Sequence, residues 1–247
     1  MNLILTMAGR GSRFIDAGIT LPKYLLEIDE SIILEKVIAS FDLDHFLSVT
    51  FICLKEHVSE YRLHKTINKA VGSHENINII AIDDTTGGQA ETAYVYLKDN
   101  YIENIVIFNV DTFFIEKLDL RDSFNEHCSG SLQLFETEFG EHYSFALPSP
   151  TEQGLANIIQ VTEKVRISHY ASTGLYLFKN SHIFNAAFEK FISDEANNSH
   201  TESYISLIYE ELIRGGATIA GFLCDEKNIK VAGTPLEYEN ILLNKSI

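Results

Sequence analysis

The sequence has no tryptophan, 4 prolines and only 3 cysteines among its 247 residues. The cysteines, Cys53, Cys128 and Cys224, are widely spaced and odd in number, which argues against a disulfide framework or a paired metal motif. No apolar run approaches the roughly 18 residues of a membrane span, and no basic region precedes the first apolar stretch. We therefore expect a reduced, cytoplasmic, globular protein with no membrane partner.

Positive charge is also scarce. The chain has 19 Lys and Arg against 35 Asp and Glu, which gives a formal net charge of -16. Nucleic-acid surfaces need clustered cations, so this composition argues against a nucleic-acid partner. If the ligand is a polyphosphate, a divalent cation and a few local positive groups must overcome the field of the whole protein.

Apolar runs alternate with segments of helical period through the first half of the chain. This alternation predicts a parallel sheet covered by helices on both faces, with ligands bound at the carboxyl ends of the strands. The expected strands are 2–7, 49–54, 76–82 and 104–110, with an extended piece at 24–28. The expected helices are 31–41, with Ser31 as N-cap, 57–71 and 89–97.

The second half changes character. Short strands that favour antiparallel pairing are expected at 131–138, 144–147, 157–161 and 174–178, and further strands at 218–222 and 229–231. Helices are expected at 181–192, at 202–214 and from Pro235 onward. Because the chain has no internal repeat, low-complexity tract or long linker, we expect one domain, 1–247, with an embedded smaller lobe.

The first stretch with a chemical signature directly follows the first strand. Gly9 and Gly11 bracket Arg10, and Ser12-Arg13 and later Pro22-Lys23 follow. Glycines without a Cβ let backbone N–H groups face an anion, while Arg13 and Lys23 supply positive charge. The alternative interpretation is ordinary turn chemistry.

Glycines also precede the helix expected at 89–97. In Asp83-Asp-Thr-Thr-Gly-Gly-Gln-Ala-Glu91, Gly87 and Gly88 would let the backbone approach a flat ligand, and the side chains before them could bind a base edge. The alternative is that Thr86 or Gly87 caps the helix.

Carboxylates and a lysine stand at other strand ends. Asp111 follows an apolar strand and could hold Mg²⁺ together with substrate phosphates, or it could cap a turn. Glu163 could accept hydroxyl hydrogens and Lys164 could face a phosphate, or both could be solvated. Gly174 could let a ring lie against the backbone. No side-chain nucleophile is evident, which suits phosphoryl or nucleotidyl transfer, where positioning and charge neutralisation suffice.

Taken in order, these stretches resemble the sugar-1-phosphate nucleotidyltransferases, also called nucleoside-diphosphate-sugar pyrophosphorylases. The resemblance covers residues 2 to about 240. The matching positions are Gly9/Gly11/Ser12/Arg13, Pro22-Lys23, Gly87-Gly88, Asp111, Glu163-Lys164, Thr173-Gly174-Leu175-Tyr176 and Gly233-Thr234-Pro235.

The resemblance implies a Rossmann-like, GT-A-like fold and an Mg²⁺-dependent transfer of a nucleoside monophosphate from a nucleoside triphosphate to a phosphorylated acceptor, most simply a sugar 1-phosphate for surface polysaccharide synthesis. Residues 1–130 would bind the nucleotide, and residues 131–247 the acceptor. The implied catalytic residues are Arg13, Lys23, Asp111 and Lys164, with Asp111 on the metal. The implied nucleotide-binding residues are Ala8, Gly9, Gly11, Ser12, Asp83, Gly87 and Gly88, and the acceptor-binding residues are Glu163, Lys164, Thr173, Gly174 and Tyr176.

Four departures from the family pattern leave alternatives open. Val165 replaces a proline, the base loop reads Gly-Gly-Gln-Ala-Glu, the C-terminal tryptophan is absent, and Val231 stands where a second metal-binding aspartate often lies. The alternatives are a cytidylyltransferase for a non-sugar phosphate such as phosphocholine, a catalytically silent nucleotide-binding paralogue, and a metal-dependent glycosyltransferase, although the last lacks a D-x-D motif. Homo-oligomerisation is left open.

Overall fold

The computed structural model describes residues 1–121, 123–124, 126–151, 154–194 and 202–243. A nine-stranded sheet forms its centre, in the order β10-β9-β11-β6-β1-β4-β5, and β8 pairs with β11 and carries β12 on its other edge. Strands β6, β1, β4 and β5 run parallel, and β11 pairs antiparallel with β6. The strands are β1 (Asn2–Met7), β4 (Ser48–Leu54), β5 (Ile77–Ile82), β6 (Glu103–Phe108), β8 (Gly130–Glu136), β9 (Ser144–Pro148), β10 (Ile158–Glu163), β11 (Tyr170–Asn180) and β12 (Ile219–Leu223).

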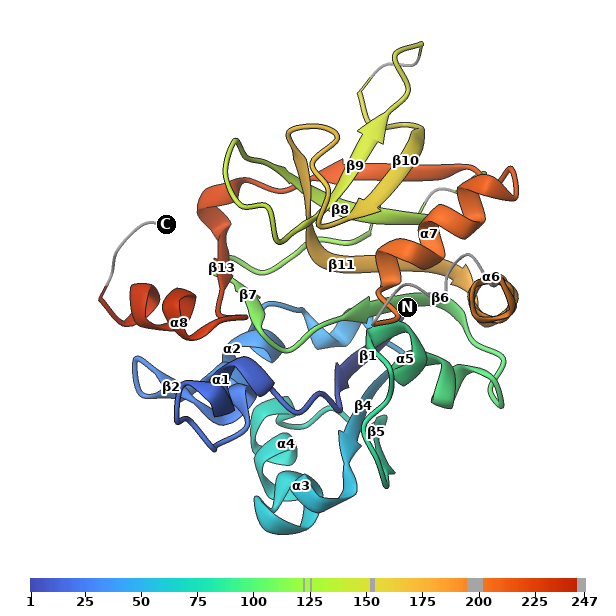
Figure 1. Cartoon of the computed structure of the whole chain (residues 1–247). Coiled ribbons are helices and arrows are strands. Elements are labelled where there is room, and N and C mark those ends of the chain that lie inside the picture. The colour runs from blue at the N-terminus through green and yellow to red at the C-terminus, as the bar shows by residue number, and fades with distance from the viewer. Residues whose placement is uncertain (122, 125, 152–153, 195–201, 244–247) are drawn as a thin grey trace.

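Helices cover both faces of this sheet (Figure 1). One face carries α5 (Gln89–Leu97), α6 (Ser181–Ser193) and α7 (Ile205–Arg214). The other face carries α1 (Ser12–Asp16), α2 (Ile33–Ala39), α3 (Lys55–Glu60), α4 (Leu63–Val71) and α8 (Pro235–Leu242).

Short elements connect these layers. Two small antiparallel ladders join β2 (Glu27–Ile28) to β3 (Ser31–Ile32) and β7 (Thr112–Phe114) to β13 (Ile229–Val231). The described residues include the 3₁₀ turns η1 (Lys23–Leu25), η2 (Leu43–His45) and η4 (Glu226–Asn228). The β7–β13 ladder brings the chain before Gly233 back beside Asp111.

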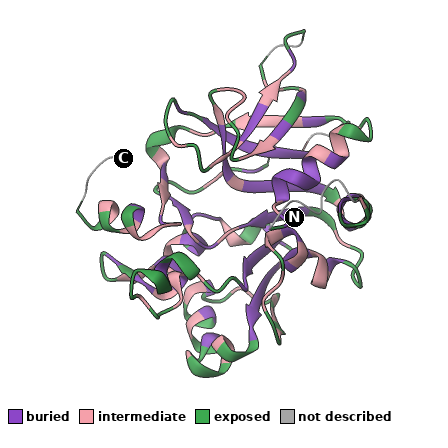
Figure 2. Ribbon diagram, in the orientation of Figure 1, coloured by how far each residue is buried: buried purple, intermediate pink, exposed green. Residues whose placement is uncertain are grey.

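Side-chain alternation along the strands divides the core into two layers. Leu3 and Leu5 of β1 point to the layer under α2 and α4, whereas Ile4 points to the layer under α5 and α7. This is the period of two that an extended chain imposes. Figure 2 shows the central strands buried and the outer helix surfaces exposed.

The predicted fold class is confirmed: the fold is α/β, with a largely parallel central sheet flanked by helices and a smaller antiparallel part at one side. Strand β1 and helix α5 have the predicted bounds. None of the described helices combines the length and apolarity needed to cross a membrane.

Several local predictions are wrong. The segment 24–28, expected to be extended, begins instead with the 3₁₀ turn η1, and only Glu27–Ile28 form a strand. Ser31 is not the N-cap of the second helix, because Ser31 and Ile32 form β3 and the helix begins at Ile33. There the Glu35 carboxylate accepts a hydrogen bond from the Ile32 backbone N–H at 3.2 Å. The single helix expected over 57–71 is two helices, because Arg62 adopts a left-handed conformation with φ 51° between α3 and α4.

A buried tyrosine provides a test of how the antiparallel part is held. The Tyr209 hydroxyl is close to the Leu177 carbonyl at 2.6 Å and the Ser131 carbonyl at 2.8 Å. We expect Tyr209→Phe to lower the free energy of unfolding by about 1 to 3 kcal/mol, because buried carbonyls lose their donor. Urea denaturation measures this change.

The matched control is Tyr101→Phe, since the Tyr101 side chain is 61% exposed and its hydroxyl donates to Glu103 at the surface. We expect a change within about 0.5 kcal/mol there. Equal effects of the two variants would show that the buried hydroxyl does not hold this part of the sheet.

Candidate active site

A cleft of about 720 Å³ opens at the carboxyl ends of β1 and β6. Its size lies in the range typical of small-molecule sites. Its lining comes from both halves of the chain, as the alternation of strands and helices predicts. Most of the predicted site residues line it: Ala8, Gly9, Gly11, Ser12, Arg13, Lys23, Gly88, Asp111, Glu163, Lys164, Thr173, Gly174 and Tyr176.

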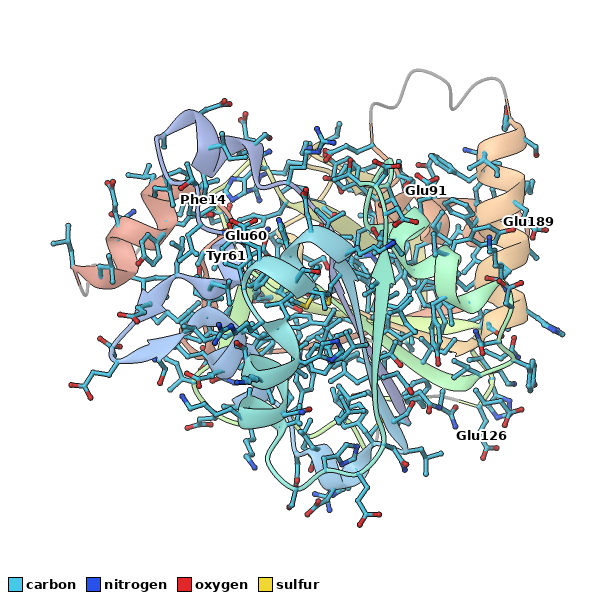
Figure 3. The ribbon with its side chains drawn as sticks, turned by 90° about the horizontal axis from the view of Figure 1, so that it is seen from below. Phe14, Glu60, Tyr61, Glu91, Glu126 and Glu189 are labelled. Atoms are coloured by element: carbon cyan, nitrogen blue, oxygen red, sulfur yellow. The ribbon has the colours of Figure 1, made fainter. Side chains whose placement is uncertain are left out.

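The glycine-rich turn leads from β1 into α1. Gly11 is the N-cap of α1 with φ 66°, a conformation that favours glycine. Gly9 and Arg13 are exposed, while Phe14 is buried and places its ring 6.4 Å from that of Tyr238 in α8. Figure 3 shows Phe14 between α1 and α8. Phe14 therefore anchors the turn while Arg13 remains available at the cleft.

The Lys23 ammonium forms an ion pair with the Asp111 Oδ2 atom across the cleft. Both side chains are partly buried, at 26% and 17% exposure. Lys23 begins η1, and the next residue, Tyr24, is buried with its hydroxyl 2.9 Å from His57 Nδ1. Burial raises the pKa of Tyr24 and lowers the pKa of His57, so this pair is neutral at pH 7. The buried Tyr24 thus fixes the backbone that carries Lys23.

The loop before α5 is bound to the second half of the chain. Gly88 has φ 147°, and a Cβ built on it would lie 2.6 Å from Ser203 backbone atoms. The Ser203 N–H donates to the Gly87 carbonyl at 2.7 Å, and the Ala90 N–H donates to the Ser203 carbonyl at 2.8 Å. The close approach at Gly88 is therefore made by the chain itself. Neither Thr86 nor Gly87 is the N-cap, because Gly88 occupies that position.

Asp83 is not part of the cleft lining. Its carboxylate pairs with the Lys55 ammonium at 2.7 Å, and the two side chains are 79% and 67% exposed. Gly87 is also outside the lining, and its N–H is bonded to the Glu91 carboxylate near the start of α5 (Figure 3). The predicted nucleotide contacts of these two residues have no geometric support in the cleft.

Glu163 lies at the end of β10 with its side chain 10% exposed. Its Oε2 atom accepts hydrogen bonds from Ser144 at 2.5 Å and from Ser206 at 2.7 Å. Tyr176 is buried beside it, and burial, followed by the Glu163 charge, raises the pKa of Tyr176 to about 12. The Glu163 carboxylate is held in place by these two hydroxyl groups and lines the cleft.

Lys164 follows in a left-handed backbone conformation, φ 56°. For a residue with a side chain this conformation costs energy, and such strain concentrates at functional sites. The ammonium lies 4.2 Å from the centre of the Tyr204 ring, is bonded to the Tyr204 hydroxyl, and is 3.9 Å from a Glu202 carboxylate oxygen. Thr173 differs, because its hydroxyl donates to buried Gln133 at 3.0 Å and is thus occupied within the protein.

The residues at Asp111 allow a test of whether a metal would fit. Asp111 Oδ1 has the Thr112 hydroxyl as its contact at 3.4 Å, so this oxygen can accept a further ligand. Within the described ranges, no group of three or more His, Cys, Asp or Glu side chains could hold a metal ion. Mg²⁺ binds through one or two carboxylates together with substrate phosphates. Asp111 therefore fits a metal shared with phosphates, whereas cleft-lining Val231 offers no ligand.

Many further cleft residues were not predicted, among them Arg10, Asn109, His142, Glu202 and Tyr204. Asn109 could have been predicted from the sequence, because it directly follows the apolar strand β6 and comes two residues before Asp111. His142, Glu202 and Tyr204 lie in polar segments without a motif, and only the folded chain brings them to the cleft.

The fold and the cleft define a nucleotidyltransferase, and comparison with known proteins agrees. The nucleotidyl transferase family matches residues 1–219, so the chain belongs to this family. No curated protein sequence matches the chain.

Solved structures are similar over nearly the whole chain. The nucleoside-diphosphate-sugar pyrophosphorylase from Vibrio cholerae RC9 is 29% identical, with a TM-score of 0.86 over 98% of this chain and 100% of that one. The inositol-1-phosphate CTP transferase from T. maritima is 14% identical, with a TM-score of 0.73 over 100% of this chain and 97% of that one. The UTP-bound UGPase from Acinetobacter baumannii is 13% identical, with a TM-score of 0.70 over 98% of this chain and 92% of that one. The last two similarities show the fold alone.

The contact at Gly88 generates a prediction about stability. We expect Gly88→Ala to lower the free energy of unfolding by about 1 to 3 kcal/mol, because the added methyl group would overlap Ser203 backbone atoms that are themselves hydrogen-bonded. Thermal or urea unfolding without ligands measures this.

Gly9→Ala is the matched control, since a Cβ built there meets no atom within 4 Å. We expect its stability to change by less than about 0.5 kcal/mol. If the two variants were equally stable, Ser203 would not fix the position of the Gly87-Gly88 loop.

Proposed function

We propose that the protein transfers a nucleoside monophosphate from a nucleoside triphosphate to a phosphorylated acceptor, a sugar 1-phosphate, and releases pyrophosphate. The observation that supports this most directly is the meeting of Arg13, Lys23, Asp111 and Lys164 in one cleft, although they come from three distant regions of the chain. Three cations around one space suit a reaction between two phosphate-bearing molecules.

In the proposed reaction, an oxygen of the acceptor phosphate attacks the α-phosphorus of the triphosphate. The bond between the α-phosphorus and the bridging oxygen breaks, and pyrophosphate leaves with the electron pair. Because both reactants are anions, their approach is disfavoured by repulsion. Lys23 and Arg13 reduce the charge at the triphosphate, and Lys164 holds the acceptor phosphate.

Asp111 is the residue that we propose as a ligand of Mg²⁺. The bound ion would neutralise charge on the phosphates as a Lewis acid. Asp111 has a second role, because it holds Lys23 in the cleft through their ion pair. The Glu163 carboxylate, held by Ser144 and Ser206, is placed to accept hydrogen bonds from acceptor hydroxyl groups.

We further propose that residues 1–130 bind the nucleotide and residues 131–247 the acceptor, within one domain. Ala8, Gly9, Gly11, Ser12 and Gly88 are the proposed nucleotide contacts that line the cleft. On the acceptor side, Gly174 and Tyr176 join Glu163 and Lys164, while Thr173 would contribute through its backbone. Synthesis of surface polysaccharide precursors in the cytoplasm is the biological setting that we propose.

The experiment that tests this function measures pyrophosphate release. The protein is incubated with Mg²⁺, each common nucleoside triphosphate, and a panel of sugar 1-phosphates, inositol phosphate and phosphocholine. We expect release with one sugar 1-phosphate and one base, and loss of activity when a chelator removes the metal. Release with phosphocholine alone would favour the non-sugar alternative, and no release with any pair would favour a catalytically silent protein.

Substitution of the central ion pair tests the assigned roles. We expect Asp111→Asn and Lys23→Ala each to lower kcat by at least ~10²-fold, the scale of removing one charge contact from a transition state. Both variants should keep the wild-type circular dichroism spectrum. Lys69→Ala, which removes a surface lysine that is 77% exposed and paired with Glu35, is the control and should leave the rate unchanged. Wild-type rates in both cleft variants would refute the assignment.

A further inference from the structure

Three residues form a row across the sheet at its carboxyl edge. In the parallel pairing of β1 with β6, Leu5 lies opposite Phe108, so the next position places Thr6 opposite Asn109. In the antiparallel pairing of β11 with β6, Tyr176 lies opposite Ile107, so two positions further Gly174 lies opposite Asn109. Asn109 thus lies between a strand of the first half and a strand of the second half.

The side chains that precede this row on the same face of the sheet are mostly apolar. Ile107 and Tyr176 belong to the hydrophobic layer under α5 and α7, and alternation puts Asn109 on the same face, two residues beyond Ile107. Asn109 and Thr6 both line the cleft. The apolar layer therefore ends at the cleft in a polar carboxamide.

The Asn109 carboxamide oxygen has no hydrogen-bond partner among the residues that the structure describes. Its Oδ1 atom is buried and, within the part of the chain that the structure describes, lacks a hydrogen bond. The neighbours in the row do not supply one, because Gly174 has no side chain and the Thr6 hydroxyl donates to the Phe108 carbonyl at 3.3 Å. A buried acceptor without a donor is costly, and such groups are rare in folded proteins.

Gly174 makes the room that the carboxamide occupies. A Cβ at position 174 would collide with Asn109 Nδ2 and would lie 3.2 Å from its Cγ and 3.6 Å from its Oδ1. Gly174 also has φ +85°, which disfavours other residues. The sequence interpretation assigned this space to a substrate ring, whereas the structure assigns it to Asn109.

The surroundings of Asn109 in the second half are those of the proposed acceptor site. Tyr176 is the next residue of β11 on the same face, and its hydroxyl lies 3.5 Å from Ser144 Oγ, which donates to Glu163. Glu163 Oε2 accepts two hydrogen bonds from protein hydroxyl groups, whereas Asn109 Oδ1 accepts none from the described residues. A hydroxyl group of the acceptor molecule would supply the donor that Asn109 Oδ1 lacks.

We propose that Asn109 is a specificity-determining residue that accepts a hydrogen bond from a hydroxyl group of the acceptor. The acceptor is then a polyhydroxylated phosphate, either a sugar phosphate or a cyclitol phosphate. Phosphocholine does not fit, because its trimethylammonium group has no O–H or N–H to donate. This inference rests on the proposed function and names its acceptor class.

The test compares Asn109→Leu with wild type. Leucine has a similar size and needs no donor, so the variant should be at least as stable as wild type in urea. We expect kcat/KM for the preferred hydroxyl-bearing acceptor to fall about 10-fold to 100-fold, the factor of one lost buried hydrogen bond. The KM for the nucleoside triphosphate should change less than about 3-fold, because the affected contact is on the acceptor.

Deoxy analogues of that acceptor identify the hydroxyl group. With the analogue that lacks the contacting hydroxyl group, kcat/KM of the wild-type protein should fall by the same factor as Asn109→Leu causes with the full acceptor. With that analogue, Asn109→Leu should cause no further fall in kcat/KM, as in a double-mutant cycle. An equal additional loss on every deoxy analogue, or a loss that appears in the KM of the triphosphate instead, would overturn the proposal. Asn109→Ala repeats the comparison with a smaller side chain, so that a failure of the leucine variant to fold is no obstacle.

Asn185→Leu is the matched control. Asn185 of α6 also has a buried Oδ1 without a partner among the described residues, but it is outside the cleft lining. This variant loses the bond from Nδ2 to the Leu97 carbonyl, so its stability should fall while acceptor discrimination stays at the wild-type value. A shift in discrimination equal to that of Asn109→Leu would show that Asn109 acts only through general stability.

A binding measurement separates this inference from the proposed function. Thermal unfolding is followed with glucose 1-phosphate, inositol phosphate or phosphocholine and without turnover. Absence of pyrophosphate release from the wild-type protein would count against the proposed reaction alone. The inference is supported if a hydroxyl-bearing phosphate stabilises wild type more than it stabilises Asn109→Leu. It is overturned if all three probes act equally on both proteins.

Discussion

The ion pair between Lys23 and Asp111 is the interaction on which the cleft depends. Lys23 begins η1 in the first half of the chain, and Asp111 lies between the central strand β6 and the small β7–β13 ladder. The Asp111 carbonyl accepts a hydrogen bond from the Ala232 N–H at 2.7 Å, which ties the segment before Gly233 to the same point. Three distant segments are thus fixed around one carboxylate.

A structural feature could be predicted from the sequence where neighbouring residues determine it, and not where tertiary packing does. The period of two in β1 and the apolar periodicity of α5 are local, and both elements have the predicted bounds. The break at Arg62 is set by a backbone conformation that the apolar pattern of 57–71 does not reveal. The glycine-rich turn and Asp111 meet because the parallel strands β1 and β6 end at one edge, whereas Glu163 and Gly174 arrive on the antiparallel strands β10 and β11. Tyr204 and Glu202 reach the cleft only through tertiary packing, for which the sequence has no local signal.

The glycines of the motifs also show what the sequence alone does not predict. A glycine in a motif indicates that something approaches the backbone closely, but the sequence does not identify what approaches. At Gly88 the neighbour is the Ser203 backbone, and at Gly174 it is the Asn109 side chain. Both glycines therefore make contacts between the two halves of the chain. The first holds the loop before α5 to the segment that leads into α7, and the second lets a polar side chain sit in the floor of the cleft.

Both lysines of the cleft lie beside carboxylates. Lys23 is bonded to Asp111, and Lys164 lies near Glu163 and Glu202. In a protein of net charge -16, these pairs keep the cations in the cleft and lower the cost of their partial burial. A phosphate that reaches Lys23 competes with Asp111 for the ammonium, and a carboxylate released in this way has a vacant oxygen for a cation. Binding of a polyphosphate and binding of a divalent cation are therefore expected to favour each other, since each one relieves the charge that the other exposes.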